Sequence, residues 1–472
     1  MGRSRSTWDC ARTRGNLRPE DAASAAGRAV ASVLRDDRHL RTFLLALSRA
    51  AASAEGLVFL AGGFLRDIAA GAPAGDIDVM VAGISHRALG KMLGSLPRAT
   101  LGVRNVVSAG IRFPVYRVAT GWNNRYVDVS VARGGAKNRR RTAMGCALED
   151  AAHRDFTVNS LLYRLSRRRD RLYGDLFDPF GGIADLSKRM IRCVGSAEDR
   201  LREDPLRALR ALRMKNEREG WRIHAATWRA VRRLGPQLLP AIPPERIVGE
   251  LLRSLAASPA GTIEDLRRSG IARALLPELS RPRGREALAA LRCRLLVRSA
   301  AAPIIPATIL LASLLADLGP EEAEAAARRL RFPNVRRVLR TLSDLRALRH
   351  SGGMRFPYAE TESILARQEE PGSFIALYMA MKISDGEPAG NLRRLLRLCS
   401  KVPVLVKGTD LEERGFPEGP GRKEALLAIR EATLRGRIRS RAEALRRVTR
   451  LCRELKEYNG NGIRRRRRKE TP

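Results

Sequence analysis

Two glycines, an arginine and two aspartates lie close together in the sequence LAGGFLRDIAAGAPAGDID. Gly62 and Gly63 follow an apolar run and precede a segment of helical character, where glycine lets backbone N–H groups approach a phosphate. Arg66 is one helical turn further on and can bind the same anion. Asp76 and Asp78 are two residues apart on an expected strand, so both carboxylates project to one face. Such a pair suits Mg²⁺ beside a triphosphate, although a turn followed by a solvated acidic strand end would give the same pattern.

A third carboxylate, Asp128, lies within the alternating sequence YVDVSV. If this strand lies beside the first two aspartates, Asp128 would complete a two-metal site or take the proton from an attacking hydroxyl. On spacing alone it could equally be an exposed strand residue.

Three arginines recur at helical spacing in EDPLRALRALR, which begins at Glu203. Pro205 fits the first turn of a helix, which places Arg207, Arg210 and Arg213 along one side. Such a ridge is often a solvated face. Because it directly follows the expected phosphate-binding unit, recognition of an anion or a base is the sharper interpretation.

The elements that must position these residues are predicted from the periodicity of apolar side chains. Residues 26–54 have the spacing of an amphipathic helix, and HRDFTVNSLL at 153–162 also shows helical spacing. Short apolar or alternating runs predict strands at 57–61, 77–81, 115–119 and 126–131, the last two as a hairpin around Asn123-Asn124. Residues 50–165 are therefore expected to form an α/β unit with a mixed sheet. From about residue 205 to 455 the pattern is helical throughout.

The chain has 472 residues, more than a single core usually holds, and its 89 Lys+Arg against 50 Asp+Glu give a net charge of +39. Base composition of the gene can contribute to this excess, but a polyanion, above all nucleic acid, is the natural partner.

The longest mainly apolar run, residues 307–315, predicts one buried helix, too short for a membrane span. The amino terminus lacks the apolar core of a secretory signal. Six widely spaced cysteines argue against a zinc site or disulfide framework and favour a reducing compartment.

The motifs GGFLRD with GDID, HRDFTVNSLL, DPFGG with ADL and IRCVG, and EDPLRALRALR together resemble the tRNA nucleotidyltransferase/poly(A) polymerase family. The resemblance spans about residues 57–215, in the family's order. It implies an α+β fold, in which a polymerase-beta-like nucleotidyltransferase head with a mixed β-sheet precedes an extended all-α neck, body and tail. Small departures from the family's preferences are Ala61 for valine, His153 for arginine and Met214 for phenylalanine.

The resemblance also implies roles for individual residues. Asp76 and Asp78 would bind Mg²⁺, with two ions expected and with Asp128 as a further catalytic carboxylate. The residues that would contact the nucleotide are Gly62, Gly63 and Arg66 at the triphosphate, Arg133, Arg154, Asp155 and Asn159 around it, and Asp204, Arg207, Arg210 and Arg213 at or behind the base. Asp204 and Arg207 would form a protein template that reads the incoming base, and residues 133–144 would be a moving part.

The family includes enzymes that add C-C-A to tRNA 3′ ends and enzymes that add poly(A). Residues 113–117, 127–133, 406–421 and 434–438 look more like the CCA-adding branch, whereas the basic run 464–469 and HRDFTVNSLLY resemble bacterial poly(A) polymerases. We favour CCA addition from CTP and ATP, because a basic tail is easily acquired. The alternatives are a poly(A) polymerase, a specialist that adds only CC or only A, and a non-catalytic RNA-binding protein.

The expected partner is RNA, most of all tRNA, with no membrane and no protein partner implied, and the expected location is the cytoplasm.

Residues 309–319 are similar to a metal-dependent phosphohydrolase helix, but Ala316 replaces the histidine of its His-Asp pair and leaves Asp317 alone. We therefore predict no phosphohydrolase activity. The expected domains are a flexible basic tail (1–25), the catalytic head (26–195), a helical neck with the template (196–275), a helical body (276–400), a tRNA-binding helical tail (401–458) and a disordered basic C-terminus (459–472).

Overall fold

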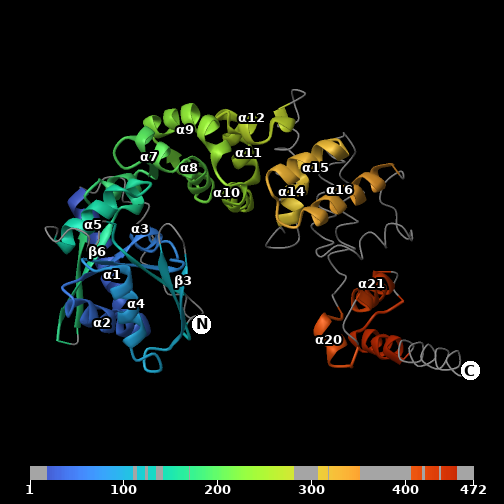
Figure 1. Ribbon diagram of the computed structural model, residues 1–472, viewed down its shortest axis with the longest axis horizontal. Helices are drawn as coiled ribbons and strands as arrows, with labels where there is room; N and C mark the ends of the chain where they lie inside the picture. The colour runs from blue at the N-terminus through green and yellow to red at the C-terminus, as the bar shows by residue number, and fades with distance from the viewer. Residues whose placement is uncertain are drawn as a thin grey trace, which may run out of the picture. The chain divides into compact units, whose positions relative to one another are not determined.

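The computed structural model divides the chain into two compact units, residues 1–239 and 240–472 (Figure 1). It describes residues 19–109, 114–122, 126–133, 142–169, 171–280, 307–316, 318–350, 405–416, 420–434 and 437–453. The predicted moving part at 133–144 falls mostly outside these ranges. Asn123-Asn124, Asp317 and the basic run 464–469 fall wholly outside them.

The first unit begins with two helices, where the sequence pattern predicted one. Helix α1 (Pro19–Asp36) starts inside the range expected to be a tail, and α2 (Arg38–Ala52) follows directly. Asp37 separates them: its backbone is extended and its side chain accepts the N–H of Leu40 at 2.9 Å, which caps α2. Apolar residues at helical spacing cannot reveal such a break, because the spacing continues across it.

A seven-stranded mixed sheet forms the body of the first unit and confirms the expected α+β head. Its strand order is β3-β4-β5-β2-β1-β6-β7, with β2 and β5 parallel and the other neighbours antiparallel. The strands are β1 (Leu57–Ala61), β2 (Ile77–Ala82), β3 (Val103–Ala109), β4 (Val115–Thr120), β5 (Tyr126–Val131), β6 (Leu162–Arg168) and β7 (Arg171–Phe177). The predicted hairpin of β4 and β5 is confirmed.

One face of the sheet carries both the packing of helix α5 (Ala143–Ala152) and the acidic residues of interest. Phe59, Met80 and Ala132 pack with α5 in one apolar cluster. Side chains alternate along a strand, so Asp78 on β2 and Asp128 on β5 share the face of Met80 and Ala132. Asp78 and Asp128 are also register partners across the parallel pair.

Two local predictions were wrong. The segment HRDFTVNSLL is not a helix: a short 3₁₀ turn, η3 (Thr157–Asn159), leads directly into β6. Its apolar residues are buried on several sides, so their spacing imitates an amphipathic helix. Asp76 is not on a strand, because β2 begins at Ile77 and Asp76 lies exposed in the bend before it.

Two helices of the first unit lie between its early strands, α3 (Gly62–Ala70) and α4 (His86–Ser95). The elements after β7 are α6 (Gly182–Ser187), α7 (Ala197–Glu203), α8 (Leu206–Asn216), α9 (Ala225–Leu238), the turn η4 (Leu239–Ala241) at the unit boundary, and the short parallel pair β8 (Met190–Ile191) and β9 (Arg222–Ile223). Pro205 is the N-cap of α8, as the sequence predicted for the start of this helix.

In the second unit, all the regular structure that the model describes is helical. Its helices include α10 (Pro244–Ala257), α11 (Pro259–Arg268), α12 (Ile271–Leu275), the turn η5 (Pro277–Ser280), α14 (Ala307–Leu315), α15 (Pro320–Arg329), α16 (Val335–His350), α20 (Gly408–Glu412) and α21 (Pro420–Leu434), and residues 441–453 are also helical. Helix α14 confirms the predicted buried helix, since Leu311, Leu314 and Leu315 are almost fully buried. Among the described helices, none is long and apolar enough to cross a membrane.

Candidate active site

The turn between β1 and α3 brings its two glycines against the Asp78 carboxylate. Gly62 has a φ of +66°, and a Cβ on it would lie 2.5 Å from Asp78 Oδ2. The N–H of Gly63 donates to the same Asp78 oxygen at 3.0 Å. Glycine is required at position 62 both for its left-handed backbone and for this close approach. Burial raises the pKa of the Asp78 carboxyl against the lowering effect of Arg154.

Two arginines from different elements lie beside this turn. Arg66 on α3 is 9% exposed, and a Cβ at Gly63 would lie 3.4 Å from its terminal nitrogen. Arg154 approaches the Cβ position of Gly62 to 3.3 Å and donates to Asp150 and to the carbonyl oxygen of Asn159. The structure thus brings the predicted Gly62, Gly63, Arg66, Asp78 and Arg154 together, and places two guanidinium groups where an anion would approach the α3 N-terminus.

A buried carboxylate links this turn to helix α8. Asp155 accepts from Arg210 at 2.6 and 2.9 Å, from the Asn159 amide at 2.8 Å and from the Phe156 N–H at 2.8 Å. Burial alone would raise the pKa of Asp155, but the charge of Arg210 and these hydrogen bonds lower it to about 2. The Asn159 amide, which donates to Asp155 through its nitrogen, accepts from Arg66 through its oxygen at 2.7 Å. Asp155 and Asn159 therefore orient Arg66 and Arg210 in this structure.

The third predicted carboxylate is close to Asp78 but is already paired. Both oxygens of Asp128 accept from Arg117 on β4, at 2.8 and 2.7 Å. Among the described residues no group of three or more acidic, histidine or cysteine side chains is arranged to hold a metal ion. Asp78 and the exposed Asp76 stay the predicted metal donors. One or two carboxylates plus substrate phosphates is the usual protein donor set for Mg²⁺, so these residues fit that ion.

A second cluster forms around Glu203 at the end of α7. Its carboxylate pairs with Arg207 at 2.7 Å, Arg200 at 3.0 Å, Arg133 at 3.1 Å and the His153 ring at 3.2 Å. Burial alone would raise the pKa of Glu203, but Arg207 and the other arginines lower it below its usual value. Two predicted nucleotide contacts, Arg133 and Arg207, thus share one carboxylate.

The three arginines of α8 do not form the open ridge that their spacing suggests. Arg207 is 5% exposed and also donates to the His153 carbonyl oxygen at 2.7 Å. Arg210 binds Asp155, and Arg213 binds Glu217 at 2.7 and 2.9 Å. Asp204, the C-cap of α7, accepts the Leu206 N–H at 3.3 Å through its side chain.

Two residues that sequence reasoning did not assign organise these clusters. Glu203 is the first residue of EDPLRALRALR, and its place in that motif could have drawn attention to it. Asp67 immediately follows Arg66 and accepts from it at 2.8 Å through both carboxylate oxygens. Its other partner, Arg218, lies 151 residues away in sequence, and no local pattern reveals that contact.

Family models match two parts of the chain. Residues 58–192 match the poly(A) polymerase head domain, and residues 220–281 match the probable RNA and SrmB-binding site of polymerase A. The first match contains both glycines, the aspartates and the 153–159 segment of the site.

Relatives extend this result. The chain is 32% identical to the multifunctional CCA protein of Xanthomonas campestris over 231 residues, which cover 47% of the chain and 51% of that protein. It is 28% identical to the CCA-adding enzyme of Geobacillus stearothermophilus over 409 residues, covering 82% and 91%, and 32% identical to poly(A) polymerase I of Salmonella typhi over 240 residues, covering 47% of each. The chain spans about half the length of the curated relatives from Xanthomonas and Xylella that it matches.

The fold has solved counterparts. A CCA-adding enzyme in complex with CTP superimposes with a TM-score of 0.60 at 21% identity, covering 89% of this chain and 97% of that one. Residues 58–192 of this chain are therefore similar to the poly(A) polymerase head domain, and the relatives that the chain matches include both CCA-adding enzymes and a poly(A) polymerase.

Proposed function

We propose that this chain adds C, C and A to the 3′ end of tRNA, using CTP and ATP and releasing pyrophosphate. The observation that carries the proposal is the turn at Gly62 and Gly63, where the Asp78 carboxylate lies within hydrogen-bond distance of the α3 N-terminus and beside Arg154. A nucleoside triphosphate is the ligand that suits this arrangement, because it supplies phosphates for the arginines and oxygens for a metal held by the carboxylates.

Two arginines would form the phosphate side of the site. Arg66 and Arg154 would bind the triphosphate, and Asn159 holds the Arg66 guanidinium from behind at 2.7 Å. Asp76 and Asp78 would hold Mg²⁺. When bound, this ion neutralises developing charge on the phosphates and lowers the pKa of a coordinated hydroxyl.

The reaction is an in-line transfer. The 3′-oxygen of the RNA forms a bond to the α-phosphorus, and the bond from that phosphorus to the bridging oxygen breaks, so that pyrophosphate leaves. Asp128 is the residue that we assign to accept the hydroxyl proton, since it is the register partner of Asp78. Arg117 must release at least one oxygen of Asp128 for this to occur.

The base side lies around Glu203. Asp204 and Arg207 would contact the edge of the incoming base, with Arg133 held by the same Glu203 carboxylate and Arg210 and Arg213 behind them. A good bidentate contact discriminates between bases by about 1–3 kcal/mol. The helices after residue 220 would hold the RNA backbone, a contact that depends on salt. An enzyme with tRNA, CTP and ATP as substrates would act in the cytoplasm.

The experiment is nucleotide addition to a tRNA transcript that ends before its CCA. With CTP alone we expect two additions, and with CTP and ATP three additions and then a stop, resolved on a sequencing gel. Addition of CC only, or of A only to a CC-ended transcript, would identify a specialist. No addition in Mg²⁺, with tRNA still bound, would mean a non-catalytic RNA-binding protein.

A poly(A) polymerase is the second candidate, favoured by the 32% identity to the Salmonella enzyme over the head. That match covers about half of each chain, whereas the match to the Geobacillus CCA-adding enzyme also includes the helical part. Long ladders from ATP alone, on tRNA and unrelated RNA alike, would establish this second candidate instead.

A further inference from the structure

Asp67 joins two arginines that come from distant parts of the first unit. Its Oδ1 accepts from Arg66 Nε at 2.8 Å and from an Arg218 nitrogen at 3.1 Å, and its Oδ2 accepts from a second Arg66 nitrogen at 2.8 Å. The Asp67 side chain is 15% exposed and that of Arg218 is 21% exposed. Arg218 also lies over the Trp221 ring, at 5.6 Å from the ring centroid.

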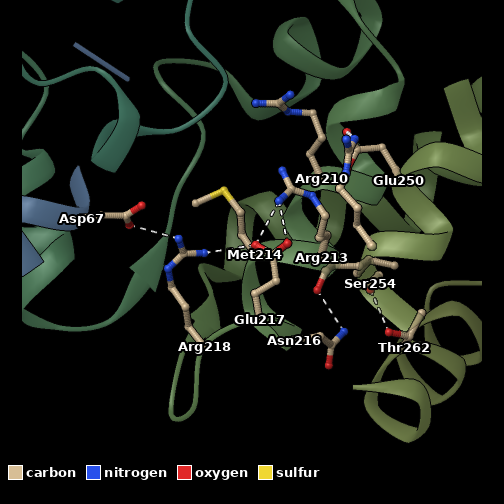
Figure 2. A network of polar contacts seen from close by, with 12 residues as sticks. Asp67, Arg210, Arg213, Met214, Asn216, Glu217, Arg218, Glu250, Ser254 and Thr262 are labelled. Atoms are coloured by element: carbon tan, nitrogen blue, oxygen red, sulfur yellow. Dashed lines mark hydrogen bonds and ion pairs between the residues drawn. The ribbon is translucent and has the colours of Figure 1, made fainter. Parts of the chain in front are cut away.

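From Arg218 the contacts continue onto helix α8. Figure 2 shows the sequence of ion pairs from Asp67 through Arg218 and Glu217 to Arg213. Glu217 accepts from Arg218 at 3.3 Å and from Arg213 at 2.7 and 2.9 Å. Asp67 on α3 is therefore connected to the C-terminal end of α8.

A second route connects the same two helices. Arg66 donates to Asn159 at 2.7 Å, Asn159 donates to Asp155 at 2.8 Å, and Asp155 accepts from Arg210 on α8. Both routes start at Arg66 and end on α8, at Arg210 and Arg213. Together with the α8 backbone between Arg210 and Arg213, the two routes form a closed circuit of contacts between α3 and α8.

The Arg66 guanidinium is bound by Asp67 on its own helix and by Asn159 before β6. Burial lowers the pKa of the Arg66 guanidinium, and the like charge of Arg218 acts in the same direction. The Asp67 carboxylate lies between these two cations. Charged hydrogen bonds are strong where water is largely excluded. The loss of Arg218 would therefore change the strength and geometry of the hydrogen bonds between Asp67 and Arg66.

We propose that Asp67 and Arg218 are positioning residues that couple the hold of Arg66 on the triphosphate to the placement of α8, the helix that carries Arg207. This inference rests on the proposed function for the identity of the ligand. It assigns a role to two residues that need not touch the nucleotide. Loosening the Asp67–Arg218 contact should therefore weaken triphosphate binding and base discrimination together.

Arg218→Met is the test, with Arg218→Lys as the conservative variant and Arg171→Met as a matched control. Arg171 begins β7 and is exposed, so its replacement removes one positive charge without touching the circuit. Four quantities are compared: the equilibrium Kd for CTP without RNA, the KM and the kcat for CTP on tRNA, and the preference for CTP over UTP. Melting temperatures identify any variant that fails to fold.

For Arg218→Met we expect CTP to bind about tenfold more weakly, and the preference for CTP over UTP to fall about fivefold, at the lower end of coupling between sites. The kcat at saturating CTP should change less than twofold. Arg218→Lys should recover at least half of the loss in affinity, and Arg171→Met should behave as the unaltered chain.

A double-mutant cycle with Asp67→Asn makes the test specific to the pair. If the two residues act through each other, Asp67→Asn with Arg218→Met will bind CTP about as weakly as the weaker single variant. Additive losses, or unchanged affinity and selectivity in a folded Arg218→Met variant, would overturn the inference. An unaltered chain that binds CTP but extends no tRNA would instead overturn the proposed function, and the cycle in CTP binding would still decide the coupling.

Discussion

At Asp78 a carboxylate is held by the backbone N–H at the start of α3, whereas at Glu203 a carboxylate is held by side chains alone. The first arrangement depends on a strand, a turn and a glycine with φ of +66°. The second gathers three arginines and a histidine, with the Glu203 side chain 28% exposed. Backbone geometry cannot rearrange without unfolding the turn, but ion pairs of side chains can exchange partners. Under the proposed function, the Asp78 region would set whether transfer occurs and the Glu203 region would set which nucleotide is transferred.

The largest effect is expected for Asp78→Asn. An amide oxygen can still accept the Gly63 N–H, so the turn should persist while the negative charge is lost. We expect nucleotide addition to fall about 1,000-fold, corresponding to several kcal/mol of lost metal-assisted stabilisation, with tRNA affinity unchanged in a filter-binding assay. Retained addition would show that Asp78 does not hold the metal.

Gly62→Ala, compared with a control glycine, should separate the effect of a strained backbone from the effect of a Cβ that clashes with Asp78. The new Cβ would lie 2.5 Å from Asp78 Oδ2, and the residue would keep a left-handed backbone that costs about 1–2 kcal/mol. Gly195→Ala is the matched control, because Gly195 has φ of +62° and no atom within 4 Å of its Cβ position. We expect both variants to melt earlier, and only Gly62→Ala to lose about 100-fold in activity, as a misplaced reacting group does. Equal activities would contradict the importance of the close approach.

Arg207→Ala tests the base side. It removes the shortest ion pair of Glu203, and we expect the preference for CTP over UTP to fall by about 10- to 100-fold while CTP affinity changes less. The control is Arg202→Ala on α7, whose side chain is 54% exposed and pairs with Glu198 and Asp199. If competition between CTP and UTP gives the same product ratio in all three proteins, Arg207 does not belong to the template.

The smallest effect concerns stability at low pH. The pKa of Asp155 is lowered to about 2 in the folded chain, below its unfolded value of about 3.9. Its contribution, on the order of 2 kcal/mol, is therefore complete above pH 4 and is lost as the pH falls toward 2. The difference in unfolding free energy between the unaltered chain and Asp155→Asn should shrink from pH 7 to pH 3 in urea titrations. A difference that does not depend on pH would mean that Asp155 acts only through its hydrogen bonds.

The two regions also differ in how far the sequence predicted them. The first two strands and the glycine turn were predictable because each depends on a few consecutive residues and on strand alternation. The pairing of Asp78 with Asp128 stayed open in the sequence, because it joins strands about 50 residues apart. The segment HRDFTVNSLL was misread as helical, since burial on several sides of a turn and strand produces the same apolar spacing.

The sequence did not predict which arginine would pair with which carboxylate. Spacing predicted an open ridge at Arg207, Arg210 and Arg213, but each of these guanidinium groups binds a carboxylate, two of which lie on other elements. Partner choice among so many arginines depends on tertiary distances. The contact between Asp67 and Arg218, 151 residues apart, is an example that no local pattern encodes.

The most direct test of this account compares the unaltered chain with Asp78→Asn on a tRNA that ends before its CCA, with CTP, ATP and Mg²⁺. The account predicts three added nucleotides and a stop for the unaltered chain, and none for the variant within the time that the unaltered chain needs to finish, with both proteins retarding the tRNA equally. Extension by Asp78→Asn at a rate near that of the unaltered chain, or long adenylate ladders from the unaltered chain, would contradict it.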